Sequence, residues 1–501
     1  MHRLAIALGL GALTALTFPP LGLWPLAFLG VAGLLHLVRQ ANGPTFGLGW
    51  AFGLGMFALS LGWIARAFTF QTAMPPWLGA VAVGALAAFL GLYWGLAAWV
   101  ARRLARGRPV ALVVALAGAV VVAELLRGEL LTGFPWNPLG LALIDLPVAP
   151  RAAALWGAPG LSALVVLAAG AGLHLLVKPR TAAALPAALA ALLALPGGVW
   201  PLPSAPPTDG LFLLVQPMAS QADKHAEGGT ERHLKAHVEL TERTLATLRP
   251  QARRRLAAVI WPEGAIEFPL EETPWLRTLV TRALPPQAFL LAGGIAVERG
   301  PTGQALGLRN SLSVLDAAGQ LRARYDKAHL VPGGEYLPLR ALAEPLGLRR
   351  LVPGTLDFWP GPGPRTLHLP GLPPLAPAIC YEIIFPGAVV DRRDRPAAIV
   401  TVSSDAWFGP WGPPQHFAQA RLRAIEEGLP ILRVTPTGIT GVIDAQGRVV
   451  ASLPAGRAGT LLVPAPGAAP PTPFARWGPA LSWGLAALLL ALGATLGHRK
   501  T

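Results

Sequence analysis

Residues 109–126 read PVALVVALAGAVVVAELL, an apolar run with a single ionisable residue, Glu124. A helix of about 20 such residues is long enough to cross the hydrocarbon core of a lipid bilayer. Further apolar runs of similar length occur near residues 4–20, 22–38, 46–65, 78–100, 154–177, 182–200 and 478–497. Only 13% of the chain is charged, whereas roughly 25% is usual in soluble proteins. We therefore expect a multi-pass α-helical membrane domain with eight spans.

The distribution of charge predicts how these spans are oriented. Of the 41 Lys and Arg and 26 Asp and Glu, 28 basic and 23 acidic residues lie within 201–476. If the N-terminus is cytoplasmic, ten of the remaining 13 basic residues fall in cytoplasmic segments, and only Arg66, Arg127 and Arg151 fall outside. This positive-inside pattern places both termini in the cytoplasm and residues 201–476 on the outer face. The net charge of +15 thus indicates topology and not nucleic-acid binding.

Residues 201–476 are typical of a soluble domain between two Pro-rich linkers, 201–207 and 464–473. Two stretches, 232–248 and 417–428, have helical patterns. Short β-like runs occur at 211–215, 257–261, 289–292, 311–315, 378–381, 398–403 and 431–435. Alternation of strands and helices predicts an α/β layered domain. The expected division is a membrane domain at 1–200, a catalytic domain at 201–476 and a closing span with its tail at 477–501.

Three places in the sequence combine a strand-like run with a polar group at or just beyond its end, and these groups could act together. Glu263 follows one strand, Lys327 lies beyond another segment, and Cys380, the single cysteine, ends a third. A thiol with an ordinary pKa of about 8.5 needs a base or a nearby cation to react as thiolate. Glu263 could accept its proton, and Lys327 could stabilise the thiolate and a later oxyanion. Taken singly, the Glu and Lys are typical solvated loop residues, and the Cys could be a buried small side chain.

The sequence around these residues resembles the carbon–nitrogen hydrolase (nitrilase) superfamily. The matching segments are Trp261-Pro262-Glu263, Tyr325-Asp326-Lys327 with Leu330-Val331-Pro332, and Cys380-Tyr381-Glu382, in the expected order. Nearly the whole chain is similar to the apolipoprotein N-acyltransferase family, through segments 330–338, 405–409, 415–416, 423–426 and 437–438 and the membrane segments 124–128 and 132–136.

This resemblance implies an αββα sandwich on the outer face of the bacterial inner membrane. It implies a Glu263, Lys327 and Cys380 triad, a supporting carboxylate at Glu335, and Tyr381 and Glu382 beside the nucleophile. The implied reaction moves a fatty acyl group from a phospholipid, through a cysteine thioester, to the N-terminal amine of a diacylglyceryl-cysteine apolipoprotein. We expect a monomer that needs no cofactor and binds no nucleic acid. The chain departs from the family pattern at four residues: Gly333, Ser404, Pro436 and His225.

Several other residues keep two interpretations. Trp407, Phe408 and Trp136 could contact substrate or membrane, or could be core aromatics or interfacial anchors. Glu124 and Arg127 could be functional, or could form an ion pair or reach towards the interface. His416 could orient the site or serve as a structural hydrogen-bonding residue. No His or Cys spacing typical of a metal site is present, so we expect no metal.

Two rival functions follow from the same sequence. One is a membrane-tethered amidase or nitrilase that uses water as the second nucleophile; it is disfavoured because a tether needs only one span. The other is a transporter or receptor whose outer domain only binds a ligand; it is disfavoured because the spans carry few ionisable residues.

Overall fold

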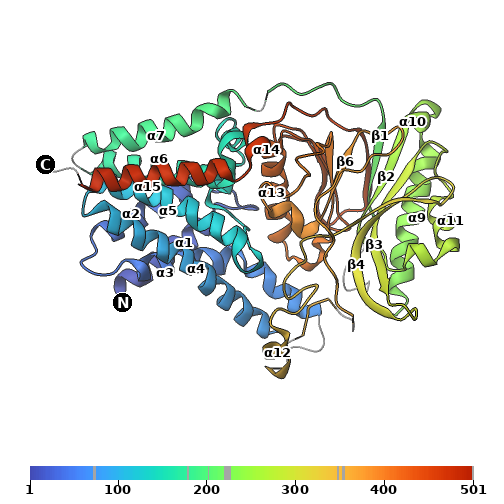
Figure 1. Cartoon of the computed structure of the whole chain (residues 1–501), viewed down its shortest axis with the longest axis horizontal. Helices are drawn as coiled ribbons and strands as arrows, with labels where there is room; N and C mark the ends of the chain where they lie inside the picture. Colours follow the sequence, from blue (N-terminus) through green and yellow to red (C-terminus); the bar gives the residue numbers. More distant parts are fainter. Residues whose placement is uncertain are drawn as a thin grey trace.

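The computed structural model describes residues 1–70, 75–177, 180–200, 202–218, 227–346, 349–352 and 356–498. One half of the molecule is helical and the other is built on β-sheets (Figure 1). His225, one of the four departures from the family pattern, lies outside the described residues.

The helical half contains the apolar runs. Its helices are α1 (His2–Ala15), α2 (Pro25–Arg39), α3 (Phe46–Ser60), α4 (Leu78–Ala105), α5 (Pro109–Glu129), α6 (Ala153–Leu176), α7 (Ala184–Ala194) and α15 (Ala480–His498). Five helices among the described residues are long and apolar enough to cross a membrane, or six if α3 and the bent 3-10 helix η1 (Gly62–Phe70) form one span. α1 and α2 are apolar but shorter, with 14 and 15 residues. The chain is thus compatible with a membrane domain, while the count of eight spans stays a prediction.

Glycines allow these helices to pack closely. A Cβ atom at Gly11 of α1 would lie 1.9 Å from the carbonyl oxygen of Phe52 in α3. At Gly49 of α3 it would lie 2.2 Å from the carbonyl oxygen of Trp94 in α4. Apolar side chains gain little by leaving lipid for a helix interface, so close backbone approach of this kind is a main source of association between spans.

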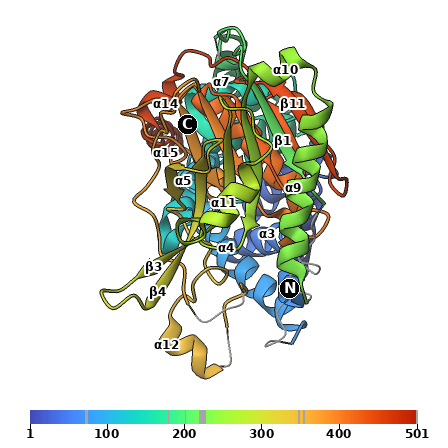
Figure 2. The ribbon, with the colours of Figure 1, turned by 90° about the vertical axis from the view of Figure 1, so that its right-hand side faces the viewer.

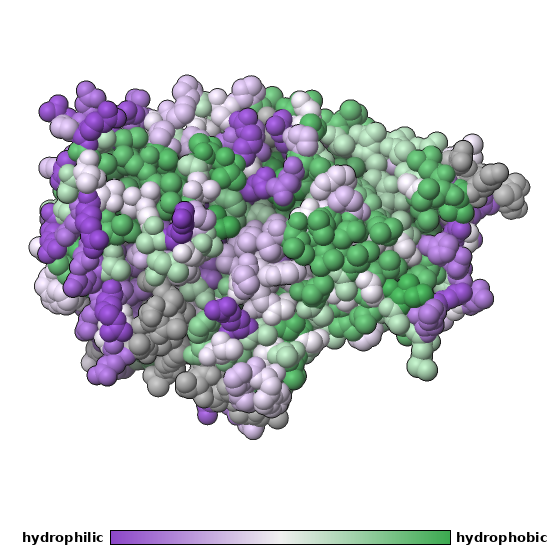
Figure 3. Space-filling view, turned by 180° about the vertical axis from the view of Figure 1, so that it is seen from behind, coloured by the Kyte–Doolittle hydropathy of each residue, from purple (hydrophilic) through white to green (hydrophobic). Residues whose placement is uncertain are grey.

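Both ends of the chain lie at the side of the helical half that faces away from the sheets (Figure 1). Arg3 and Arg102 donate hydrogen bonds to the carbonyl oxygens of Gln40 and Ala41, which places three of the basic segments expected in the cytoplasm at one end. Seen from behind, hydrophobic side chains cover much of the helical half, and hydrophilic ones gather at its far end (Figure 3). This surface pattern is what a membrane domain requires.

The other half contains two sheets. The first has the strand order β11-β1-β2-β3-β4-β5 and the second β10-β9-β8-β7-β6. The strands are β1 (Leu211–Gln216), β2 (Leu256–Ile266), β3 (Phe289–Arg299), β4 (Ala305–Leu315), β5 (Leu321–Asp326), β6 (Leu375–Ile379), β7 (Ala398–Val402), β8 (Ile431–Val434), β9 (Thr440–Ile443), β10 (Val449–Leu453) and β11 (Gly459–Pro464). The helices are α9 (Gly229–Thr247), α10 (Pro250–Arg255), α11 (Pro274–Thr281), α12 (Arg340–Ala343), α13 (Gly412–Glu427) and α14 (Pro473–Trp477).

The two sheets face each other, with helices on both outer sides (Figures 1 and 2). Alternate residues of a strand point to opposite faces. On β2, Ile260 joins the core between the sheets, whereas Trp261 joins a second core under α9 and α11. The outer face of the second sheet packs on α13, and that core continues without interruption into the membrane helices. The result is a four-layer α/β sandwich in which α13 lies between a sheet and the membrane half.

One buried amide joins the two halves. The Oε1 atom of Gln415, on α13, accepts hydrogen bonds from Trp63 Nε1 at 3.1 Å, Trp136 Nε1 at 2.9 Å and Asn137 Nδ2 at 3.0 Å. Its Nε2 atom donates to the carbonyl oxygen of Ser60 at 3.2 Å. All four partners belong to the helical half of the chain. Near the other end of α13, Glu426 Oε1 accepts from the backbone N–H of Ala158, beside the break in α6 at Gly157.

We predict that Gln415→Leu destabilises the protein strongly. The substitution keeps the volume of the side chain but leaves buried donors of Trp136 and Asn137 without their acceptor, at a cost of about 1–3 kcal/mol for each such group. The apparent melting temperature of the Gln415→Leu variant in detergent should fall well below that of the parent protein. Gln419→Leu, one turn further on α13, is the matched control, because Gln419 is also buried and its Nε2 atom has no partner among the described residues. Equal melting temperatures for the two variants would contradict the prediction.

Candidate active site

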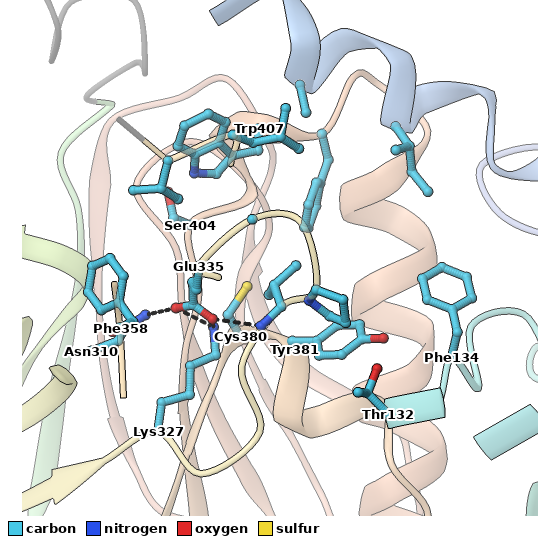
Figure 4. A pocket seen from close by; sticks show the side chains of 18 of the residues that line it. Thr132, Phe134, Asn310, Lys327, Glu335, Phe358, Cys380, Tyr381, Ser404 and Trp407 are labelled. Carbon is cyan, nitrogen blue, oxygen red and sulfur yellow. Dashed lines mark hydrogen bonds and ion pairs between the residues drawn. The ribbon is translucent and has the colours of Figure 1, made fainter. Parts of the chain in front are cut away.

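A cavity of about 460 Å³ lies between the sheet half and the membrane half. Glu263, Lys327, Glu335 and Cys380 line one side of it, and Figure 4 shows the last three converging. The other side is formed largely by apolar residues from η1, from α4 and from the segment that follows α5. The structure thus brings together sequence-predicted residues that are up to 117 positions apart, from Glu263 to Cys380.

Glu263 lies near the end of β2, where neighbouring groups fix both of its carboxylate oxygens. Asn310 Nδ2 donates to Oε1 at 2.7 Å, and the backbone N–H of Ser404 donates to Oε2 at 2.6 Å. The neighbouring strand β3 has a glycine, Gly293, at the closest point, where a Cβ atom would lie 2.6 Å from the Cα of Glu263. Glycine at this position therefore allows the carboxylate to sit where the two sheets meet.

Lys327 follows the last residue of β5 and is 1% exposed. Its Nζ atom lies 3.0 Å from Glu335 and 3.5 Å from Glu263 Oε1. Burial alone would lower the pKa of this ammonium, but the two carboxylates outweigh burial and raise the pKa above its ordinary value. Lys327 is therefore a permanent cation at neutral pH. A buried charge of this kind is stable only because it is paired.

Glu335 completes this cluster. Its carboxylate accepts from Lys327 Nζ, from Asn310 Nδ2 at 2.7 Å and from the backbone N–H of Val331 at 2.8 Å. Asn310 therefore bridges Glu263 and Glu335. Our sequence interpretation missed Asn310, because it began the strand at Ser311 and no motif marks the residue before it.

Cys380 lies directly after β6, at the first position of the short 3-10 helix η9 (Cys380–Ile384). The sequence interpretation, which carried this strand on to 381, was wrong by two residues. Cys380 has a left-handed backbone with φ of +51°, a conformation uncommon outside glycine and found at functional sites. Burial raises the pKa of its thiol; Glu263 raises it further, and Lys327 partly opposes this. The resting group is therefore a thiol that needs a base to react.

Tyr381 and Glu382 have different surroundings although both directly follow Cys380. The carboxylate of Glu382 accepts from Tyr325 Oη at 2.8 Å and from the backbone N–H groups of Ala328 and Ile379 at 2.7 Å each. It therefore ties the Lys327 segment to the Cys380 segment. Tyr381 lines the cavity and donates from its hydroxyl to the carbonyl oxygen of Gly133 at 2.9 Å.

The aromatic candidates form one cluster at the junction of the two halves. Trp136 is buried, and its ring lies 5.8 Å from that of Phe408; Phe408 in turn lies 4.5 Å from Trp63. Trp407 lies beside the cavity opposite Lys327 (Figure 4) and packs edge-on against Phe70. All of these rings except that of Phe70 line the cavity. These rings therefore pack together as part of the interior and also border the cavity.

Glu124 and Arg127 hold the backbone of the segment after α5. Arg127 donates to the carbonyl oxygens of Phe134 and Trp136, at 2.8 and 2.6 Å. Glu124 accepts from the backbone N–H of Leu139 and from Ser162 Oγ, at 2.8 and 2.7 Å. These bonds position the aromatic segment that forms part of the cavity wall. Among the described residues no group of three or more His, Cys, Asp or Glu side chains is arranged to hold a metal ion.

Comparison with known proteins adds the family. Residues 10–171 match the family model of the apolipoprotein N-acyltransferase N-terminal domain, and residues 220–466 match that of carbon-nitrogen hydrolase. An apolipoprotein N-acyltransferase of Bradyrhizobium diazoefficiens is 37% identical, over 99% of this chain and 95% of that protein. Another, from Caulobacter vibrioides, is 38% identical, over 95% of this chain and 91% of that protein. The chain belongs to the apolipoprotein N-acyltransferase family. A solved amidase from Nesterenkonia is only 16% identical, with a TM-score of 0.36 over 52% of this chain and 92% of that one.

The departures from the family pattern of the apolipoprotein N-acyltransferases make their visible contacts through the backbone. Ser404 holds Glu263 with its N–H group, and Pro436 accepts from the N–H of Met218 with its carbonyl oxygen, at 2.9 Å. Gly333 has a φ of +73°, which glycine adopts without strain. Because backbone atoms make the contacts of Ser404 and Pro436, other residue types at these positions would keep them.

We predict that alkylation of Cys380 reports the charges around it. Because Cys380 is the single cysteine, the rate of its alkylation by iodoacetamide at fixed pH rises with its thiolate fraction. Lys327→Met should slow alkylation and Glu263→Gln should speed it, on the order of tenfold for each pKa unit that the thiol shifts. Glu267→Gln is the control, since Glu267 lines the cavity but is not among the charges that shift this thiol. Changes of the opposite sign would show that other groups govern the thiol.

Proposed function

We propose that this protein transfers a fatty acyl group from a phospholipid to the N-terminal amine of a diacylglyceryl-cysteine apolipoprotein, through a thioester on Cys380. The observation that carries the proposal is the composition of the cavity. A thiol, a carboxylate and a buried ammonium lie on one side, and the apolar membrane half forms the other side. The family to which the chain belongs supports the same assignment.

In the first half-reaction, the sulfur of Cys380 attacks the ester carbonyl carbon of the phospholipid. Glu263 accepts the thiol proton, and the carbonyl oxygen becomes an oxyanion held by Lys327 Nζ and the backbone N–H of Tyr381. The C–O ester bond then breaks. Glu263 returns the proton to the departing lysophospholipid oxygen, which leaves the acyl group on sulfur as a thioester.

In the second half-reaction, the acceptor amine attacks the thioester carbonyl. Glu263 removes a proton from the amine, the same donors hold the second oxyanion, and the C–S bond breaks. The Cys380 thiolate recovers the proton, and the product is an amide. Because ester is converted to amide, the reaction is downhill and requires no nucleotide or other cofactor.

The thioester must survive until the amine arrives, so the site has to exclude water. Trp63, Phe134 and Phe408, which line the cavity, supply an apolar wall for this purpose. Both substrates are lipid-anchored, and their confinement to one membrane surface raises their effective concentration. We infer that the sheet half faces the periplasm, that both termini are cytoplasmic and that the protein acts as a monomer in the inner membrane.

We predict that a phospholipid with a labelled acyl chain leaves a hydroxylamine-sensitive label on Cys380 of the purified protein in detergent. Addition of a diacylated lipopeptide with a free N-terminal amine should discharge the label into an amide. Glu263→Gln should lower the rate of labelling by about 10²–10⁴-fold, the usual contribution of a positioned base. Cys380→Ser transfer at the parent rate would overturn the proposal. Free fatty acid as the main product would instead indicate a hydrolase that uses water as the second nucleophile.

A further inference from the structure

A fully buried histidine contacts the backbone of the nucleophile. His416, next to Gln415 on α13, places its Nε2 atom 3.1 Å from the carbonyl oxygen of Cys380. Its Nδ1 atom lies 3.1 Å from a guanidinium nitrogen of Arg433 and 3.1 Å from Asp405 Oδ1. Arg433 and Asp405 are themselves paired at 2.7 Å, and all three side chains are 0% exposed.

These partners determine which ring nitrogen of His416 carries a proton. Cys380 offers a carbonyl oxygen, which can only accept, so Nε2 must donate. Arg433 can only donate, so Nδ1 of a neutral ring accepts from it. Burial and the Arg433 charge lower the pKa of His416, which favours this neutral ring with its proton on Nε2. A protonated ring would carry a second proton facing Asp405 and would still donate from Nε2.

The contact has a consequence for the N–H group that follows Cys380. The peptide unit between Cys380 and Tyr381 is planar and trans, so its C=O and N–H groups point in opposite directions. His416 holds the C=O group, and it thereby fixes the direction of the Tyr381 N–H. The surrounding 3-10 helix has only five residues, and such helices have poor hydrogen-bond geometry, so a second anchor matters here.

We propose that His416 is a positioning residue that aims the backbone N–H of Tyr381 at the oxyanion formed on the Cys380-bound acyl group. The inference rests on the proposed function. It assigns His416 no proton transfer and no contact with substrate. Asp405 and Arg433 act one step further away, because they fix the tautomer and the ring orientation of His416.

Two amide variants distinguish the contributions of the Nε2 and Nδ1 atoms of His416. Glutamine at 416 carries its amide near the position of Nε2 and can still donate to the Cys380 carbonyl. Asparagine carries its amide near the position of Nδ1, so it keeps the bond to Arg433 and loses the donor to Cys380. The acyl donor is a p-nitrophenyl fatty ester, which reports thioester formation without phospholipid or lipoprotein. Iodoacetamide alkylation of Cys380 is measured in parallel, because that displacement forms no oxyanion.

His416→Asn should lower the rate of Cys380 acylation at saturating ester by up to about 100-fold, the cost of a misplaced catalytic group. Its ester concentration at half-saturation and its alkylation rate should stay near those of the parent protein, and His416→Gln should restore acylation. Parent-like acylation in His416→Asn overturns the inference, as does failure of His416→Gln to restore it. A parallel loss of acylation and alkylation also overturns it, because it would mean that His416 only holds the thiol or the fold. Absence of any Cys380 adduct in the parent protein would overturn the proposed function itself.

Discussion

The acceptor oxygen of Gln415 gathers three hydrogen bonds between the two halves of the molecule. Three N–H donors from the helical half converge on it, and those of Trp136 and Asn137 are buried. An unmet donor in such a place is expensive, so the contact fixes the rotation of α13 as well as its position. His416 is the next residue, so the helix that docks on the membrane half also contacts the backbone of Cys380. One helix therefore joins the membrane half to the candidate site.

The charged groups of the site also depend on one another. Lys327 lies in the interior only because Glu335 and Glu263 neutralise it, and Asn310 keeps the two carboxylates in place. The same arrangement leaves the Cys380 thiol protonated at rest, since burial and Glu263 outweigh the nearby ammonium in setting its pKa. A thiol that rests protonated must lose its proton before the sulfur can attack a carbonyl, and Glu263 is the candidate base for that step.

Local sequence predicted the elements that carry these groups but not the contacts between them. Strands such as β1 and β7 are apolar on both faces and stand out as short hydrophobic runs. β5, in contrast, has the sequence LRARYD. Its alternating arginines leave no apolar run, and it was not among the expected strands. Glu382 was expected beside Cys380, yet three of the four hydrogen bonds that it accepts come from residues more than 50 positions away. No local signal marks Asn310, and none links Gln415 to its partners, which lie up to 355 residues away. The catalytic roles of Glu263, Lys327 and Cys380 stay predictions.

The shape of the cavity is tied to the same docking contact. Trp63 and Trp136 line the cavity, and their Nε1 atoms donate hydrogen bonds to Gln415. A movement of either ring that widened the cavity would therefore strain or break its bond to α13. Because α13 also holds the Cys380 carbonyl through His416, any such movement would shift the backbone of Cys380. Under the proposed function, a lipid substrate that fits between these rings would leave Cys380 aligned, whereas one that forces them apart would displace it.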